Sequence, residues 1–218
     1  MPSKKRTHTT ISDKSPPRPS RKLSQTRREI AAEAARIMAT QGLYNFRVAK
    51  QKAAEHMRIR SSTALPSNAE VEEALRAYQQ FYGGHEHNER IQSKRSAALG
   101  FMRLLETFSP RLVGPVLEGT ADQHAPVTLH LFSDPTDAIV MHLMDKRLSF
   151  KNEQRKFRWH DGGFRLVPIL ITDFQDQTIE LALFNAIDLR QAPPSPIDGR
   201  PQKRAPLSEV ECLLAGAA

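Results

Sequence analysis

Cysteine is almost absent from this 218-residue chain, and long apolar runs are missing altogether. The single cysteine, Cys212, excludes an internal disulfide and a zinc site built on several cysteines. Its place in the C-terminal SEVECLLAG predicts a small buried side chain rather than a nucleophile. No stretch approaches the roughly 18 apolar residues that a transmembrane helix needs. The basic N-terminus also lacks the apolar core of a secretory signal, so we expect a reducing, cytoplasmic setting and no membrane partner.

Acidic residues are scarce at the N-terminus. Residues 1–28 contain nine lysines and arginines and only one acid, Asp13. The other 190 residues contain 23 bases and 23 acids, so the net charge of +8 belongs to this segment. Its Ser, Thr and Pro content predicts a disordered basic tail over residues 1–28. The tail is expected to be a solvated leader, or to make a weak, salt-sensitive contact with nucleic acid or acidic surfaces. The neutral remainder argues against strong DNA binding by the folded part.

Helical periodicity dominates residues 29–110. Apolar side chains recur every three or four residues in RREIAAEAARIMATQG, in RVAKQKAAEHMRI and in the segment that ends before Pro110. Ser67 and Glu70 have the spacing of a capping box at the start of a further helix. We therefore expect a helical N-terminal region.

After Pro110 the period of the pattern changes from 3.6 residues to two. RLVGPVL and VTLHLF are predicted strands, and Asp134 is expected to cap a helix that has Pro135 in its first turn. FKNEQRKFRWHDGGFRLVPILITDFQDQTIELALF predicts strands joined by tight turns. The chain is thus predicted to be α+β, with a small mixed β-sheet and flanking helices over residues 111–190. Residues 191–218 are predicted to form a proline-rich wrapping loop and a short helix capped by Ser208.

The stretch from Leu117 to Asp134, LEGTADQHAPVTLHLFSD, predicts a strand, a Gly-Thr turn, a polar loop and a second strand. Gly119 lets the backbone approach a phosphate closely, and the hydroxyl of Thr120 can bond a phosphate oxygen. With its helical lead-in, this arrangement resembles the nucleotidyltransferase fold of the minimal bacterial type. The resemblance covers roughly residues 86–190, and extends more loosely to the helices before them and to the later SPIDGRP segment.

The resemblance implies a nucleoside triphosphate held above two acids spaced by one residue, which share divalent metals, with a third acid on a neighbouring strand. Here the acid pair would fall on Pro126 and Thr128, or one step later on Thr128 and His130, and none of these is a carboxylate. Glu180 in TIELALF is the candidate for the third acid. The candidate nucleotide-binding residues are therefore Gly119, Thr120, Thr128, His130 and Glu180.

We interpret the chain as a degenerate nucleotidyltransferase-like protein that binds a nucleotide or phosphate ligand, or acts as a scaffold. An active Mg²⁺-dependent nucleotidyltransferase is the first alternative, and only that alternative requires Mg²⁺. No catalytic residue and no metal site are predicted. The sequence contains no Gly-x-Ser-x-Gly motif, Walker loop or dinucleotide fingerprint.

A DNA-binding regulator is the second alternative. EIAAEAARIMATQGLYNFRVAKQKAAEHMRI is similar to the first helices of a TetR-type helix-turn-helix regulator. In that family a recognition helix follows at once, whereas RSSTALPSNAE interrupts the pattern at Pro66. The remainder of such a regulator would also be helical, which disagrees with the strand patterns after Pro110.

A metal site built on histidine is a weaker alternative. His85 and His87 in GGHEHNER are predicted to lie in a solvated polar loop. His124, His130 and His142 lack the cysteine or acid that would complete a zinc site with them.

Overall fold

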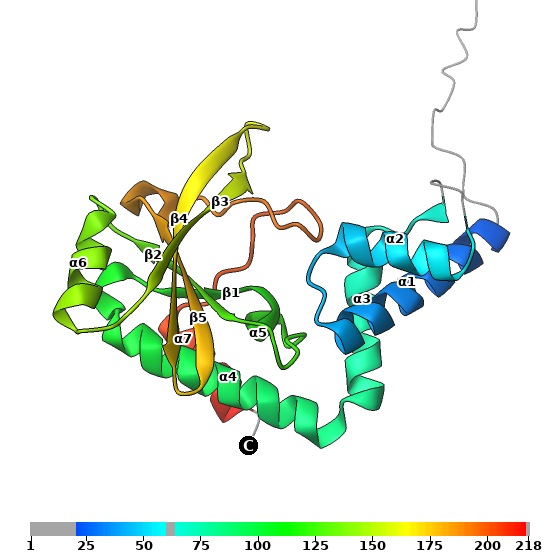
Figure 1. The fold of residues 1–218 in the computed structure, drawn as a ribbon, viewed down its shortest axis with the longest axis horizontal. Coiled ribbons are helices and arrows are strands. Elements are labelled where there is room, and N and C mark those ends of the chain that lie inside the picture. Colours follow the sequence, from blue (N-terminus) through cyan, green and yellow to red (C-terminus); the bar gives the residue numbers. More distant parts are fainter. Residues whose placement is uncertain (1–20, 60–63, 217–218) are drawn as a thin grey trace, which may run out of the picture.

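The chain folds into a helical module and a sheet module, which are linked by one long helix (Figure 1). The computed structural model describes residues 21–59 and 64–216. The helices within these ranges are α1 (Arg21–Gln41), α2 (Phe46–His56), α3 (Asn68–Tyr82), α4 (Gly84–Leu104), α5 (Gly114–Glu118), α6 (Asp137–Asp145) and α7 (Leu207–Ala215). The strands are β1 (Arg111–Val113), β2 (Val127–Phe132), β3 (Lys151–Arg158), β4 (Phe164–Phe174) and β5 (Gln177–Phe184). The predicted α+β class is confirmed.

Helices α1, α2 and α3 form the helical module around an apolar core of their own. Ile30, Ile37 and Leu75 belong to this core, together with many alanines that allow close helix packing. The predicted capping box begins α3. The Ser67 hydroxyl accepts a hydrogen bond from the Glu70 amide at 3.2 Å, and the Glu70 carboxylate accepts one from the Ser67 amide at 2.6 Å.

Helix α1 begins earlier than the sequence pattern predicts. It starts at Arg21, so residues 21–28, which were expected to belong to a disordered tail, form its first two turns. Their arginines are compatible with a helix because long unbranched side chains lose little freedom there. The rest of the predicted tail, residues 1–20, lies outside the described residues.

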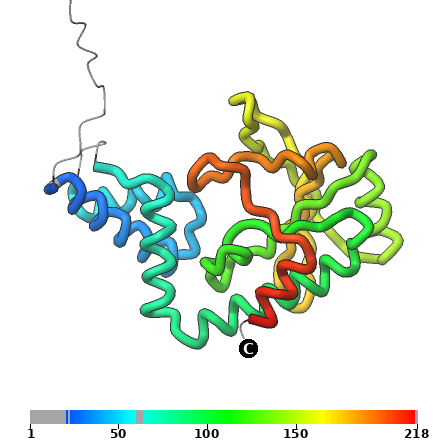
Figure 2. Tube along the Cα trace, turned by 180° about the vertical axis from the view of Figure 1, so that it is seen from behind, coloured from blue at the N-terminus to red at the C-terminus, as the bar shows by residue number. Residues whose placement is uncertain are grey.

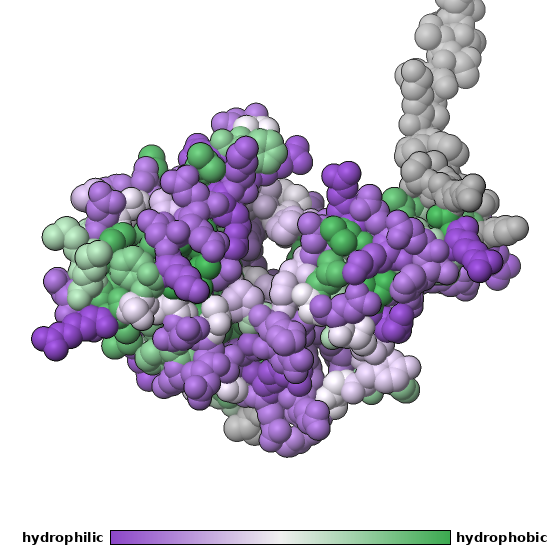
Figure 3. Space-filling view, viewed as in Figure 1, coloured by the Kyte–Doolittle hydropathy of each residue, from purple (hydrophilic) through white to green (hydrophobic). Residues whose placement is uncertain are grey.

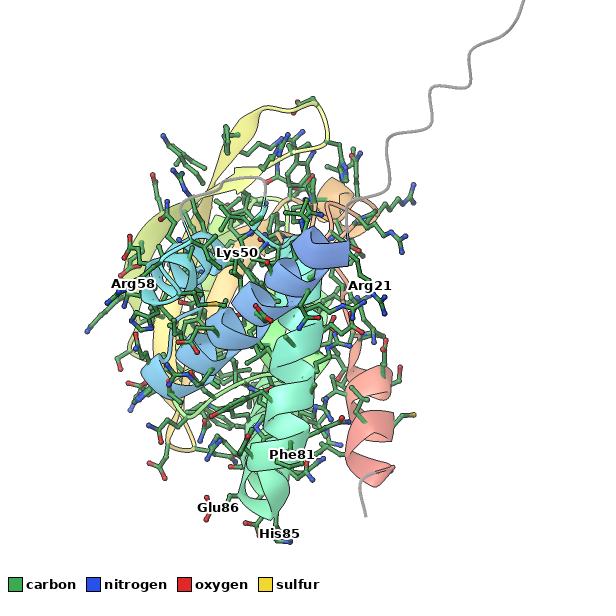
Figure 4. The ribbon with its side chains drawn as sticks, turned by 90° about the vertical axis from the view of Figure 1, so that its right-hand side faces the viewer. Arg21, Lys50, Arg58, Phe81, His85 and Glu86 are labelled. Carbon is green, nitrogen blue, oxygen red and sulfur yellow. The ribbon has the colours of Figure 1, made fainter. Side chains whose placement is uncertain are left out.

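Helix α4 also begins earlier than expected. The predicted polar loop GGHEHNER is helical, because α4 starts at Gly84, whose φ of 48° turns the chain from α3 into α4. Figure 4 shows Phe81, His85 and Glu86 around this corner. His87 is buried, and its Nε2 lies 2.9 Å from the Gly119 carbonyl oxygen, so contact with the sheet module stabilises this polar turn.

The sheet module contains, in the part of the chain that the structure describes, a five-stranded sheet in the order β1-β2-β5-β4-β3. β2 and β5 are parallel, and the other neighbouring strands are antiparallel. One face packs against α4, α6 and α7, and α7 lies alongside α4 (Figure 2). The strand residues of this buried face include Val127, Leu129, Leu131, Leu181 and Leu183. Their period-two spacing was predicted correctly for β2.

The segment between β1 and β2 differs from its prediction. RLVGPVL is not one strand, since β1 ends at Val113 and helix α5 follows. Gly114 has a φ of 73° and Pro115 lies in the first turn of α5, and both favour a helix start at this point. Gly119 ends α5 in a left-handed conformation with a φ of 79°. The Gly-Thr pair therefore ends a helix and not a strand.

Three smaller expectations were wrong. Helix α6 begins at Asp137 rather than at Pro135, and the Asp134 carboxylate accepts a hydrogen bond from the Ala186 amide at 3.2 Å instead of capping α6. Helix α7 begins at Leu207 without a side-chain cap, so Ser208 is not its cap. Cys212 is exposed on α7, because it lies on the side of this short helix that faces away from Val210 and the core.

The proline-rich segment lies against the edge of the sheet module and also reaches the helical module, where Asn68 donates to the Pro196 carbonyl at 2.6 Å. Ala205 forms an isolated bridge with Leu112 at the edge of β1, and Pro194 forms another with Pro201 around a turn. In Figure 3 apolar side chains gather over the helical module and at the α6 end of the sheet module, among a mainly polar surface. None of the helices in residues 21–59 and 64–216 combines the length and apolar character that crossing a membrane requires.

Candidate ligand-binding face of the sheet

The sheet has a second face, which carries most of the predicted site residues. Thr128 and His130 on β2 alternate with the buried leucines, and Thr128 is the register partner of Glu180 on the parallel strand β5. Arg155 of β3 and Arg204 of the C-terminal segment reach the same face. We call this surface, formed by these five residues and their apolar neighbours, the arginine face.

Glu180 is held by an arginine. Its two carboxylate oxygens each accept a hydrogen bond from Arg155, at 2.9 Å and 2.9 Å. The side chain of Glu180 is 14% exposed and that of Arg155 is 48% exposed. A bidentate pair of this kind occupies both carboxylate oxygens and neutralises their charge. Glu180 is therefore already paired with a cation, and Thr128 beside it supplies no carboxylate for a metal ion.

His130 is a neutral hydrogen-bond acceptor for Arg204. It is 1% exposed, and its Nδ1 accepts from the Arg204 Nε at 3.1 Å. Burial holds the pKa of His130 well below its usual range, and the nearby charge of Arg204 lowers it further. Because Nδ1 accepts from a permanent donor, the ring proton must be on Nε2. His130 thus orients Arg204 and presents an N–H donor of its own.

Arg204 lies over an apolar floor and keeps a spare donor. Its guanidinium carbon is 4.9 Å from the ring centre of Phe132 and 5.3 Å from that of Phe184. One terminal nitrogen donates to the Asp188 carbonyl at 2.7 Å, and the other, Nη2, is buried without a hydrogen-bond partner. Burial lowers the pKa of Arg204 to about 10, against the opposing attraction of Asp188. It remains a cation at neutral pH.

Further charges surround Arg204. Arg111 of β1 is close enough to lower its pKa. The guanidinium of Arg165 stacks over Trp159, 4.0 Å from the ring centre, and lies 3.4 Å from the Asp188 carboxylate. These arginines outnumber the carboxylates beside them, so the surroundings of Arg204 favour an anion.

Gly119 and Thr120 do not join the arginine face. The amides of both residues donate to the Pro115 carbonyl, which leaves neither free for a phosphate. The Thr120 hydroxyl lies near the carboxylate of Glu72 in α3, and the Thr120 carbonyl accepts from Gln79 at 2.8 Å. The Gly-Thr pair thus connects the sheet module to the helical module.

Two side chains of α4 fix the segment from α5 to the start of β2. The sequence pattern did not indicate either of them. Arg95 donates to the carbonyls of Val116 and Leu117 at 3.1 Å and 2.9 Å. Lys94, which is 4% exposed, donates to the carbonyl of Ala125 at 2.7 Å. Burial lowers the pKa of Lys94. On a helix, a buried lysine next to an arginine shows no distinctive spacing, so these contacts had no sequence signal.

The histidines that the structure describes lie apart from one another and do not form a metal centre. Among residues 21–59 and 64–216, no three His, Cys, Asp or Glu side chains come together in a way that could hold an ion. His142 packs its ring against Phe108, His124 lies beside Gln123, and His85 lies near Glu89. No protein-family model matches the sequence, and no curated protein is detectably similar to it.

Proposed function

We propose that this chain is a nucleotidyltransferase-like protein that binds a phosphate-bearing ligand, such as a nucleotide, on the arginine face and does not transfer nucleotides. The proposal rests chiefly on one observation. Where the resemblance implies metal-binding acids, Thr128 stands beside Glu180, and both oxygens of Glu180 are taken by Arg155. Two-metal transfer needs free anionic oxygens at this position.

The phosphate part of the proposal is supported by Arg204. Its partnerless Nη2 is a buried charged donor, and leaving such a donor unsatisfied costs free energy that an anion would recover. His130 holds the guanidinium in place, and the rings of Phe132 and Phe184 support it from below. A phosphate oxygen is the anionic acceptor that the resemblance itself suggests. The cytoplasmic setting expected from the sequence belongs to the same proposal.

A binding and transfer assay tests both parts. Pyrophosphate and ATP are titrated calorimetrically with and without Mg²⁺, using the wild type, Arg204→Gln and the control Arg103→Gln. Arg103 forms an exposed pair with Glu211 elsewhere on the surface. We expect binding that Arg204→Gln weakens at least tenfold, that Arg103→Gln leaves unchanged, and that Mg²⁺ alters less than twofold.

The same samples are incubated with labelled nucleoside triphosphates and candidate acceptors. No transfer of label is expected. Mg²⁺-dependent transfer that is lost in Glu180→Gln would show an active transferase and contradict the proposal. Binding of pyrophosphate that is equal in the wild type and Arg204→Gln would contradict the assigned face.

A further inference from the structure

The contact between the two modules encloses a cavity of about 50 Å³. Its walls come from α1, α3 and the start of α2 with the link before it, and from α5 with the loop after it. We call it the joint cavity. Its apolar wall is formed by side chains such as Met38, Leu43, Phe46 and Leu75. It is far smaller than the roughly 300–1,000 Å³ of pockets that hold drug-sized ligands.

The polar wall of the joint cavity is built from oxygen atoms. Glu72, Gln79, Thr120 and Asp122 line it and are each at most 9% exposed. Tyr44 also lines it and donates its phenol hydrogen to Asp122, whose carboxylate accepts two backbone amides as well. Burial raises the pKa of Tyr44, with help from Asp122, so its hydroxyl stays protonated.

Two acceptors in this wall have no hydrogen-bond partner: Oε1 of Glu72 and Oε1 of Gln79. The orientation of Gln79 is fixed, because its Nε2 donates to the Thr120 carbonyl and a flipped amide could not. Arg76 forms an ion pair with Glu72, but its Nε lies 3.8 Å from Oε1, which is too far for a hydrogen bond. The wall therefore keeps two buried acceptor oxygens that no protein donor satisfies, one of them on a carboxylate.

We propose that the joint cavity is a binding site for a primary ammonium group carried on a short aliphatic stem. An ammonium group offers three donors and a positive charge, which match the free oxygens of Glu72 and Gln79 and the negative charge of the Glu72 carboxylate. The apolar wall fits the stem. A divalent ion requires more oxygen ligands than the two free oxygens provide.

The test compares matched small molecules on the full chain at pH 8. Calorimetry and thermal unfolding are measured with n-butylammonium chloride, 1-butanol, ammonium chloride and potassium chloride at constant ionic strength. At a concentration ten times its Kd, a ligand of the native state should raise Tm by about 3 °C. We expect this rise for butylammonium, and no rise for 1-butanol, because the alcohol has the same stem without the charge.

Two variants locate the site. Glu72→Gln keeps the shape of the side chain and removes its charge, and Glu73→Gln makes the same change on the exposed neighbour in α3. Glu72→Gln should weaken butylammonium binding at least tenfold, and Glu73→Gln should not. Three outcomes overturn the proposal: no binding of butylammonium to the wild type, an equal response to potassium or ammonium ions, or binding that survives in Glu72→Gln. If Glu72→Gln fails to fold, the comparison of butylammonium with 1-butanol on the wild type still tests the proposal.

Discussion

On the arginine face, the buried guanidinium of Arg204 keeps a donor without a partner, whereas at the joint cavity Glu72 and Gln79 each keep an acceptor without one. The two places otherwise resemble each other, since both set fixed polar groups against an apolar wall. Whether the unpaired group is a donor or an acceptor decides which ligand each place can bind. A spare donor on a cation favours an anion, and spare oxygens on buried acids favour a cation.

The two places also differ in what fixes them. Strand register sets the arginine face, since alternate residues of β2 and β5 must point to one side. The joint cavity depends on contacts between modules, in which Gln79 and His87 reach the Thr120 and Gly119 carbonyls. A substitution in the sheet should therefore affect the whole molecule, and one at the joint should affect the docking of the helical module most.

The largest effect is expected for Phe184→Ala. Phe184 is 2% exposed, and its ring lies 4.7 Å from that of His130 and 5.9 Å from that of Phe132. Truncating a buried phenylalanine removes apolar burial and leaves a cavity, so unfolding in urea should show a loss of about 3–5 kcal/mol. Phe81→Ala is the control, because Phe81 is 81% exposed, and it should cost less than about 0.5 kcal/mol. Equal losses would mean that the arginine face has no rigid floor.

The next effect is expected at the joint, for Asp122→Ala. The Asp122 carboxylate accepts from the Tyr44 hydroxyl and from the amides of His124 and Ala125, the latter two at 2.8 Å each. Removing it leaves buried donors unsatisfied, so we expect a loss of about 2–3 kcal/mol in urea unfolding. The loss should also expose α3 amides to faster hydrogen exchange, because the helical module undocks.

Asp161→Ala is the matched control for Asp122→Ala. Asp161 accepts an amide hydrogen bond from Gly163 at 2.8 Å in the same kind of local turn, but on an exposed hairpin. Its removal should cost about 0.5–1 kcal/mol. A loss as large as that of Asp122→Ala would show that local turn geometry, and not the joint, carries the effect.

Arg155→Ala should have a smaller effect than either. It leaves the carboxylate of Glu180, which is mostly buried, without its bidentate partner. Since Arg155 is itself half exposed, we expect a loss of only about 1–2 kcal/mol in urea unfolding, and less at high salt. Arg103→Ala breaks an exposed pair with Glu211 and should cost less than about 0.5 kcal/mol. If Mg²⁺ restores the stability of Arg155→Ala, then freed Glu180 binds metal and the arginine face can be converted to a cation site.

The sequence predicted what short-range patterns control and missed what long-range contacts control. The change of period after Pro110, the capping box at Ser67 and the alternation of VTLHLF follow from local backbone geometry, and the structure has all three. The pairing of Arg155 with Glu180 spans 25 residues, and that of Arg204 with His130 spans 74. Neither pairing leaves a spacing signature in the sequence.

The same reasoning explains the error at the Gly-Thr pair. Glycine with positive φ is needed both where a strand turns and where a helix ends, so Gly119 alone could not decide between them. Pro115 four residues earlier was the signal for a helix start. Thr128, His130 and Glu180 could be placed on one face only because period-two alternation is rigid, and the structure brings them together.

The smallest effect is expected for Glu72→Gln, and its size depends on pH. Burial raises the pKa of Glu72, while the hydroxyl of Thr120 and the cation of Arg76 oppose the rise and Glu118 adds to it. Asp122 is a further acid in the same cavity wall. Folded Glu72 therefore holds its proton more tightly than the unfolded chain, whose value is near 4.5. Its contribution to stability is complete below that value and is lost as pH rises through the folded pKa.

The glutamine of Glu72→Gln cannot ionise. The variant's free energy of unfolding should therefore rise relative to that of the wild type as pH rises above about 4.5, and the difference should become constant once Glu72 is fully charged. Urea unfolding from pH 4 to pH 8 should show this gain, which we expect to stay within about 1 kcal/mol, the scale of one hydrogen bond. The free energy of unfolding of Glu73→Gln should differ from that of the wild type by the same amount at every pH. Butylammonium at pH 8 should stabilise the wild type alone and so reduce the difference, because the ligand supplies the charge and donors that ionised Glu72 lacks. A stability difference between Glu72→Gln and the wild type that is independent of pH would mean that Glu72 has an ordinary pKa in the folded protein. A group of the protein would then satisfy the free oxygen of Glu72, and no ligand would be needed.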